Sequence, residues 1–178
     1  MRGNRGRTVC AAVAATAAVL AMPAAPASAD PAAGDYSCDI AALTVQNELM
    51  NGQSGSFTAS GAGECWTGTT GAKVATQFSA SGTYRAQKCS LISVAQPGYL
   101  TLNGTLTIAP SGASPVSTGV TISTADVATS NTGAGTISLA SGQTGYVTVK
   151  YGSPVLGVIE RCGGDPFRPT YKGTFTAR

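Results

Sequence analysis

Acid–base chemistry in this chain depends on carboxylates, because the 178 residues include no histidine. Histidine is the general base of Ser-His-Asp and Cys-His catalysis and the commonest metal ligand, so neither kind of site is expected. Two carboxylates could still hydrolyse a glycan. The candidates for such a pair are Asp39, Glu48, Glu64, Asp126, Glu160 and Asp165. They are scattered along the chain, and we interpret them as solvated surface charges of a non-enzyme without cofactor or metal.

Aromatic side chains offer a second chemistry, the binding of a sugar ring. Such a platform needs an exposed aromatic face with polar groups beside it. The candidates are Trp66, with Tyr99, Tyr146 and Tyr151 as companions. Successive strand residues point to opposite faces, so an inward Cys65 would turn Trp66 outward. Trp66 could equally cover a disulfide or pack between sheets, and we favour that structural role.

Two short motifs have simple structural explanations. Gly61-Ala62-Gly63 resembles a fragment of a phosphate-binding loop but opens no helix, so we interpret it as a glycine pair in a strand. The segment CGGDPFRP, Cys162 to Pro169, could form a recognition loop because loops often carry function. Its Gly-Gly and Asp-Pro pairs fit a turn between the last two strands equally well.

The N-terminus is expected to be a secretory signal peptide. Three arginines precede an apolar run at 8–22, and small residues lead to Ala29, where we place the cleavage. No later run of about 20 apolar residues would anchor the chain in a membrane. The sequence therefore predicts a signal peptide at 1–29 and a single secreted β domain at 30–178 without membrane insertion.

The net charge of the secreted part is near zero. The whole chain has 11 Lys and Arg against 8 Asp and Glu, but three of the arginines belong to the predicted signal. Nucleic-acid-binding proteins carry clustered positive charge, which this domain lacks. We expect no nucleic-acid partner.

Four cysteines remain after the predicted cleavage: Cys38, Cys65, Cys89 and Cys162. An even number in an exported chain, without a CxxC pair or histidine, favours two disulfides. Three pairings are open. Consecutive strands are usually neighbours, which favours Cys38 with Cys65 and Cys89 with Cys162.

The remaining pattern is an alternation with a period of two, which predicts β-strands. Alternating runs begin at Tyr36, Phe57, Val74, Leu100, Val116, Gly135, Tyr146, Val155 and Tyr171. Clusters of Gly, Pro, Ser and Asn separate most of them. The chain is therefore predicted to be all-β, an antiparallel β-sandwich or partly closed β-barrel of about eight or nine strands. A short helical turn competes only at 41–50.

Asn103-Gly104 presents a local conflict. Asn-Gly between alternating runs is a strong hairpin signal. A turn there would split the apolar residues between two faces, whereas one continuous strand keeps Leu100, Leu102, Leu106 and Ile108 together. We predict a single strand with Gly104 facing inward, and we do not expect the mid-strand sequon at Asn103 to be glycosylated.

Glycine recurs at inward positions of the predicted strands, namely Gly61, Gly63, Gly82, Gly104 and Gly173. Glycine inside a strand indicates a sharp bend, close backbone approach or room for a bulky neighbour. A strongly coiled barrel or tight sandwich would need these features. Aromatic side chains could fill the space, or part of it could stay open for a small apolar ligand.

The Ala-rich signal, the Gly/Thr/Ser-rich strands and the predicted disulfides resemble small exported β proteins of actinobacteria. The resemblance rests on no specific motif and implies no active site. We expect a secreted, non-catalytic protein that binds a ligand or belongs to the cell envelope as a structural component. Its ligand is not identified by the sequence, and the two candidate partners are a cell-envelope glycan and a small apolar molecule. The alternatives are a carrier of a small apolar molecule in a barrel cavity and a glycan-active hydrolase with a carboxylate pair.

Overall fold

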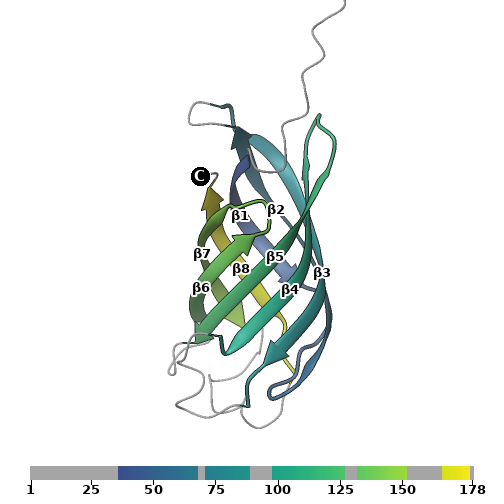
Figure 1. Ribbon diagram of the computed structural model, residues 1–178, viewed down its shortest axis with the longest axis vertical. Helices are drawn as coiled ribbons and strands as arrows, with labels where there is room; N and C mark the ends of the chain where they lie inside the picture. The colour runs from purple at the N-terminus through teal and green to yellow at the C-terminus, as the bar shows by residue number, and fades with distance from the viewer. Residues whose placement is uncertain (1–35, 68–70, 89–97, 127–131, 152–165, 177–178) are drawn as a thin grey trace, which may run out of the picture.

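The computed structural model describes residues 36–67, 71–88, 98–126, 132–151 and 166–176. These residues form eight strands that wind into one barrel (Figure 1). The strands are β1 Tyr36–Val45, β2 Ser54–Thr67, β3 Val74–Ala86, β4 Leu100–Pro110, β5 Val116–Asp126, β6 Thr132–Leu139, β7 Thr144–Tyr151 and β8 Pro169–Thr176.

The barrel is closed by its first and last strands. Each strand pairs antiparallel with the next along the chain, and β8 returns to pair with β1. This register joins Cys38 to Phe175 and Leu43 to Tyr171. Closure removes the unpaired edges that an open sheet would expose. The predicted all-β antiparallel fold is confirmed, the sandwich alternative is wrong, and the barrel is closed rather than partly closed.

Several predictions concern residues outside the described ranges. These are the signal peptide at 1–29, the alternating run from Val155 to Cys162, most of the segment 162–169, and the pairing of Cys89 with Cys162. In the described part of the chain, no helix is long and apolar enough to cross a membrane.

Strand β4 illustrates how the alternation builds the interior. Its residues Leu100, Leu102, Leu106 and Ile108 are buried and belong to one continuous hydrophobic core. The strand runs through Asn103 and Gly104 and stays paired with β3 and β5 on both sides. This continuous pairing confirms the single-strand prediction. The physical reason is that burying four large apolar side chains stabilises the fold more than a favourable turn dipeptide would.

The inward glycines mark places where neighbouring backbones nearly touch. Gly82 and Gly104 lie opposite each other on β3 and β4. A Cβ added to Gly104 would lie 2.1 Å from the carbonyl oxygen of Ser81, where no side chain fits. Bulky residues occupy the adjacent space, since Phe57 pairs with Gly82. The predicted close approach and the room for a bulky neighbour are both confirmed.

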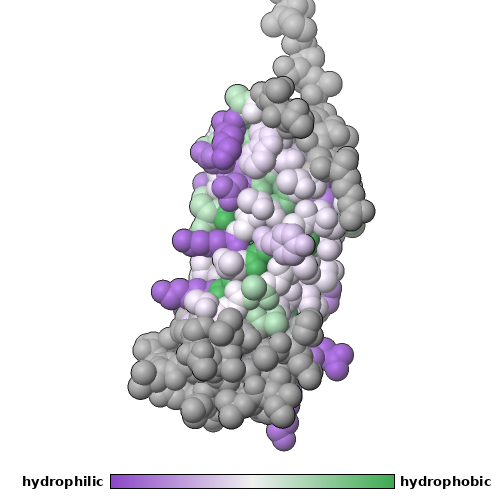
Figure 2. All heavy atoms as spheres, turned by 90° about the vertical axis from the view of Figure 1, so that its left-hand side faces the viewer, coloured by the Kyte–Doolittle hydropathy of each residue, from purple (hydrophilic) through white to green (hydrophobic). Residues whose placement is uncertain are grey.

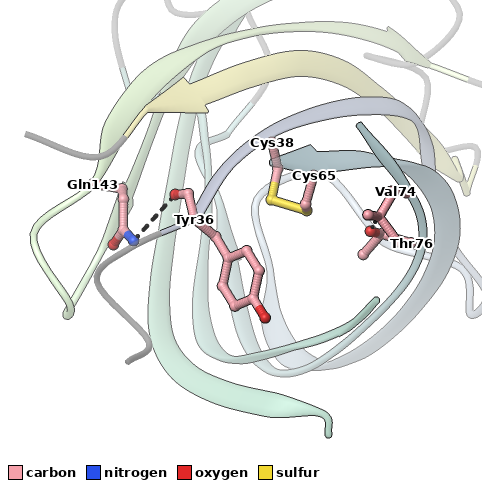
Figure 3. The surroundings of a disulfide bond; sticks show 6 residues. All are labelled: Tyr36, Cys38, Cys65, Val74, Thr76 and Gln143. Carbon is pink, nitrogen blue, oxygen red and sulfur yellow. Dashed lines mark hydrogen bonds between the residues drawn. A yellow bond between two sulfur atoms is a disulfide. The ribbon is translucent and has the colours of Figure 1, made fainter. Parts of the chain in front are cut away.

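A disulfide ties β1 to β2 inside the barrel. Cys38 and Cys65 lie opposite each other in the register and both are buried. Figure 3 shows this bond together with the ring of Tyr36, and Gln143 Nε2 donates a hydrogen bond of 3.3 Å to the Tyr36 carbonyl oxygen. The Cys38–Cys65 pairing is confirmed.

The helical turn considered at 41–50 is wrong. Strand β1 continues to Val45, with a β-bulge between Ile40 and Ala42. The chain then crosses the end of the barrel, where Leu49 and Phe167 exchange backbone hydrogen bonds of 2.9 and 3.0 Å. Both of these side chains are buried, so they help to close this end of the core.

Candidate functional site

Tyr146 is the most conspicuous side chain on the outside of the barrel. It lies on β7 with 79% of its surface exposed, and it is the large hydrophobic residue that the described surface leaves uncovered. Its neighbours on the strand explain this orientation, because Val147, Val149 and Tyr151 are buried and occupy the opposite parity. The ring therefore stands on the solvent side of the sheet.

Two depressions flank Tyr146. The first has a volume of about 560 Å³, and its polar lining side chains are Thr136, Ser138, Thr144, Thr174 and Thr176. The second has a volume of about 310 Å³ and is lined by Ala134, Thr148, Lys172 and Thr174 beside the ring. Both depressions use the outer faces of β6, β7 and β8, so Tyr146 separates a hydroxyl-lined hollow from a mainly apolar one.

Glycine backbone forms part of the floor of these hollows. Gly145 lines the first depression, and Gly135 and Gly173 line the second. Each is an inward position where a Cβ would collide with the neighbouring strand, at 1.7 Å from the Thr174 carbonyl oxygen in the case of Gly145. The close approach inside the barrel therefore coincides with the hollows outside it.

The surface around the site has little charge. Figure 2 looks at the side of the molecule that is on the left in Figure 1, where β7 lies, and most of it is pale. The strongly hydrophilic side chains stand out at its margin. Among the described residues that line the two depressions, Lys172 is the charged one and none is a carboxylate. Threonine and serine hydroxyls, which both donate and accept hydrogen bonds, are the main polar groups of the first depression.

Tyr99 and Tyr151 lie inside the barrel instead. Both are fully buried, and each side chain has a partner: the Tyr99 hydroxyl donates to Asn51 Oδ1, and the Tyr151 hydroxyl lies 3.3 Å from Thr124 Oγ1. Burial raises the pKa of Tyr151 well above its usual value. Neither ring shares a surface with Tyr146.

Trp66 faces outward from β2, as its parity with the buried Cys65 predicts. It is half-buried, and Lys73 Nζ lies over the ring, 5.2 Å from its centroid. Lys73 also forms an ion pair of 3.3 Å with Glu64. The lysine covers one face of the indole through a cation–π contact. Trp66 and Tyr146 lie on β2 and β7, so the structure does not combine them in one site.

The structure brings two of the carboxylates together. Asp39 on β1 lies directly opposite Glu64 on β2. Glu48 instead forms an ion pair of 3.3 Å with Arg168, and the side chains of Asp126, Glu160 and Asp165 are outside the described part. The proximity of Asp39 and Glu64 could have been predicted from the sequence. Asp39 follows Cys38 and Glu64 precedes Cys65, so a cross-strand Cys38–Cys65 bond makes these carboxylates neighbours.

No group of three or more His, Cys, Asp or Glu residues that could hold a metal ion occurs within the described ranges. Comparison of the chain with protein-family models, with curated proteins and with solved structures finds no match.

Proposed function

We propose that this protein is a non-catalytic extracellular binding protein that takes a neutral glycan on the outer face of β6–β8. The observation that carries the proposal is Tyr146, an aromatic ring 79% exposed between a hydroxyl-lined hollow and a mainly apolar one. A ring of this kind can stack on the apolar face of a sugar, while the threonine and serine hydroxyls exchange hydrogen bonds with the sugar hydroxyls.

The charge of the site favours a neutral ligand. The described lining residues include one cation, Lys172, and no anion. An anionic polymer would be expected to select a cluster of Lys or Arg, because several charges are needed for strong electrostatic attraction. The buried disulfide also agrees with life in an oxidising compartment outside the cytosol.

The alternative that the protein carries a small apolar ligand inside the barrel has less support than binding on the outer face. Inward side chains from all eight strands are buried in one core, and several of them are aromatic, such as Phe57, Phe78 and Phe175. Such side chains fill the interior of a small barrel. The two depressions beside Tyr146 are formed mainly by outward side chains rather than by the interior.

The test is retention on immobilised neutral polysaccharides, followed by calorimetry with the one that binds. Tyr146→Ala should weaken binding about tenfold, which corresponds to the loss of roughly 1.4 kcal/mol of stacking. Tyr146→Phe keeps the ring and should bind nearly as well as the wild type. Trp66→Ala, three strands away on β2 and outside both depressions, is the aromatic control and should have no effect. Binding that survives Tyr146→Ala would refute this assignment.

A hydrolase is the second candidate, and the opposition of Asp39 and Glu64 favours it. Residues directly opposite on antiparallel strands have Cβ atoms about 5 Å apart, which is compatible with the carboxyl separation in retaining glycosidases. Glu64 is held by Lys73 on an exposed surface, however, and an acid catalyst needs an environment that keeps it protonated. Release of reducing sugar that is lost in Glu64→Gln but kept in Glu48→Gln would establish this function.

A further inference from the structure

The two hollows beside Tyr146 differ in the chemistry of their walls. In the register of β6, β7 and β8, Tyr146 lies between Thr136 and Thr174, so these three residues form the middle row of the outer face. The next row on one side carries only hydroxyl side chains, those of Ser138, Thr144 and Thr176. The next row on the other side consists of Ala134, Thr148 and Lys172. The ring of Tyr146 therefore has a hydroxyl side and a side of mixed character.

The hollow on the mixed side is walled mainly by carbon. Ala134, Val147 and the Tyr146 ring line it, together with the backbone of two glycines. Ala134 points outward with a single methyl group, so it leaves room next to the ring. A sugar hydroxyl placed against these groups would exchange water for carbon and lose hydrogen bonds. The hollow, of about 310 Å³, therefore suits a small ligand group that is partly apolar.

Two polar side chains of the same hollow have complementary roles. Thr148 Oγ1 donates a hydrogen bond of 3.3 Å to the Lys172 carbonyl oxygen, so its hydrogen is engaged and the oxygen remains an acceptor. The Lys172 ammonium group has only donors. It forms no ion pair with any residue that the structure describes. The hollow thus combines an apolar wall with one cationic donor and one acceptor.

We infer that this hollow is a subsite for an acetamido group, so that the glycan contains N-acetylated sugar units. The inference rests on the proposed function. An acetamido group ends in a methyl group and carries one acceptor and one donor. The methyl group packs against Ala134 and the Tyr146 ring. The carbonyl oxygen accepts a hydrogen bond from the Lys172 ammonium group, and the amide N–H donates one to Thr148 Oγ1. Such sugars are neutral, as the proposed function requires.

The spacing along β7 suits this arrangement. Tyr146 and Thr148 are both exposed and lie two residues apart on one face, about 7 Å along the strand. A sugar ring stacked on Tyr146 therefore needs a substituent a few atoms long to reach Thr148, and a hydroxyl group is too short. The opposite edge of the same sugar faces the hydroxyl row, where its own hydroxyl groups exchange hydrogen bonds.

The test compares sugars that differ only in the acetamido group. Oligomers of N-acetylglucosamine and of glucose with the same linkage and length form one pair, and N-acetylgalactosamine and galactose form another. In calorimetry with the wild type, the acetamido member of a pair should bind roughly tenfold more tightly, because it gains a hydrogen bond to a charged donor and an apolar contact.

The outcomes separate this inference from the proposed function. Equal affinity within the pairs, or tighter binding of the hydroxyl member, would overturn the inference. The same holds if the wild type binds only a polysaccharide without acetamido groups. In these cases the proposed function would stand as long as binding still required Tyr146. If the wild type binds no neutral sugar at all, the proposed function itself fails.

Variants of the hollow show which residues recognise the acetamido group. Ala134→Val narrows the hollow with a side chain suited to a strand, so it should weaken only the acetamido member, roughly tenfold. Lys172→Met keeps the length of the side chain but removes the donor, and it should reduce the preference for the acetamido member about threefold. Lys172→Arg keeps a donor and should retain most of the preference. An unchanged preference in both Ala134→Val and Lys172→Met would contradict this subsite.

Lys150→Met is the matched control for the lysine variant. Lys150 is also exposed on β7, but it is not among the described residues that line either hollow. This variant should bind both members of each pair like the wild type. A sugar carrying a carboxylate in place of the acetamido group tests the alternative role of Lys172 as an anion partner. If that sugar binds more tightly than the acetamido sugar and loses the gain in Lys172→Met, the acetamido assignment is wrong.

Discussion

Replacing an inward glycine by alanine should destabilise the barrel far more than the same change at an outward glycine. At Gly104 the added Cβ would lie 2.1 Å from the Ser81 carbonyl oxygen and 2.9 Å from the Gly82 Cα. Both atoms belong to backbone, so no side-chain rotation relieves the collision. At Gly119, one strand away, the added Cβ would meet only the Ala140 methyl group at 3.1 Å. The two positions thus differ in what must move.

The magnitudes follow from that difference. Overpacking usually costs about 1–3 kcal/mol, and Gly104→Ala should lie near 3 kcal/mol because β3 and β4 must separate. For a domain of this size such a loss lowers the melting temperature by about 6–12 °C. Gly119→Ala should be neutral or slightly stabilising, since glycine in a strand costs about 0.5–1 kcal/mol relative to alanine.

The assay is thermal unfolding followed by circular dichroism, with urea unfolding as an independent measure of the free energy. Both variants should keep the wild-type strand spectrum at low temperature. A Gly104→Ala variant that melts with the wild type would refute the argument that backbone contact at this position requires glycine. Equal destabilisation by both variants would show that strand glycines matter here for another reason.

Four further predictions concern the core and export. The hydroxyl of Tyr171 is buried without a hydrogen-bond partner among the described residues, so Tyr171→Phe should raise the melting temperature; a decrease would reveal a partner. Burial raises the pKa of Tyr151 and Tyr171 above the usual 10.0, so stability should be complete below pH 10 and fall as pH rises towards the raised values, with a shallower fall in Tyr171→Phe; an equal slope would contradict this. The Cys38–Cys65 bond spans 27 residues, and its loss in the double alanine variant should cost about 3.5 kcal/mol in urea unfolding, whereas an unchanged midpoint would exclude that contribution. Secreted material should begin at Asp30 and show no free thiol under denaturing, non-reducing conditions, and an intact N-terminus or a titratable thiol would each disprove its part.

The strands could be predicted from the sequence because alternation reports directly on which face is buried. The eight runs that fall in the described ranges are all strands. The choice between sandwich and barrel could not be made this way, since both give the same alternation. Closure of the barrel depends on one pairing between strands distant in the sequence, β1 and β8. No local sequence pattern indicates that Leu43 lies opposite Tyr171.

The mistaken helical turn at 41–50 has a physical origin in the β1 bulge. An extra residue between Ile40 and Ala42 shifts the parity of the strand. The buried residues Ile40, Leu43 and Val45 therefore follow at spacings of three and two. A spacing of three is one that helices use, so a bulge in a buried strand imitates a helical face.

The candidate site could be predicted only in part. Sequence reasoning included Tyr146 but did not distinguish it from Tyr151, although the two are five positions apart and therefore lie on opposite faces of one strand. Applying the alternation to β7 would have selected Tyr146 as the outward ring. The hollows beside Tyr146 could not be predicted, because they are assembled from three strands whose register only the folded barrel defines.

Closure of the barrel and the shape of its outer surface have a common cause. The inward glycines Gly104, Gly135, Gly145 and Gly173 let adjacent backbones approach where a side chain would collide. Three of them, Gly135, Gly145 and Gly173, form part of the floor of the two hollows beside Tyr146. Where a sheet bends sharply inward, its outward side chains diverge, and the backbone between them becomes accessible. The glycines that allow the eight strands to close therefore also expose backbone in the hollows on either side of Tyr146.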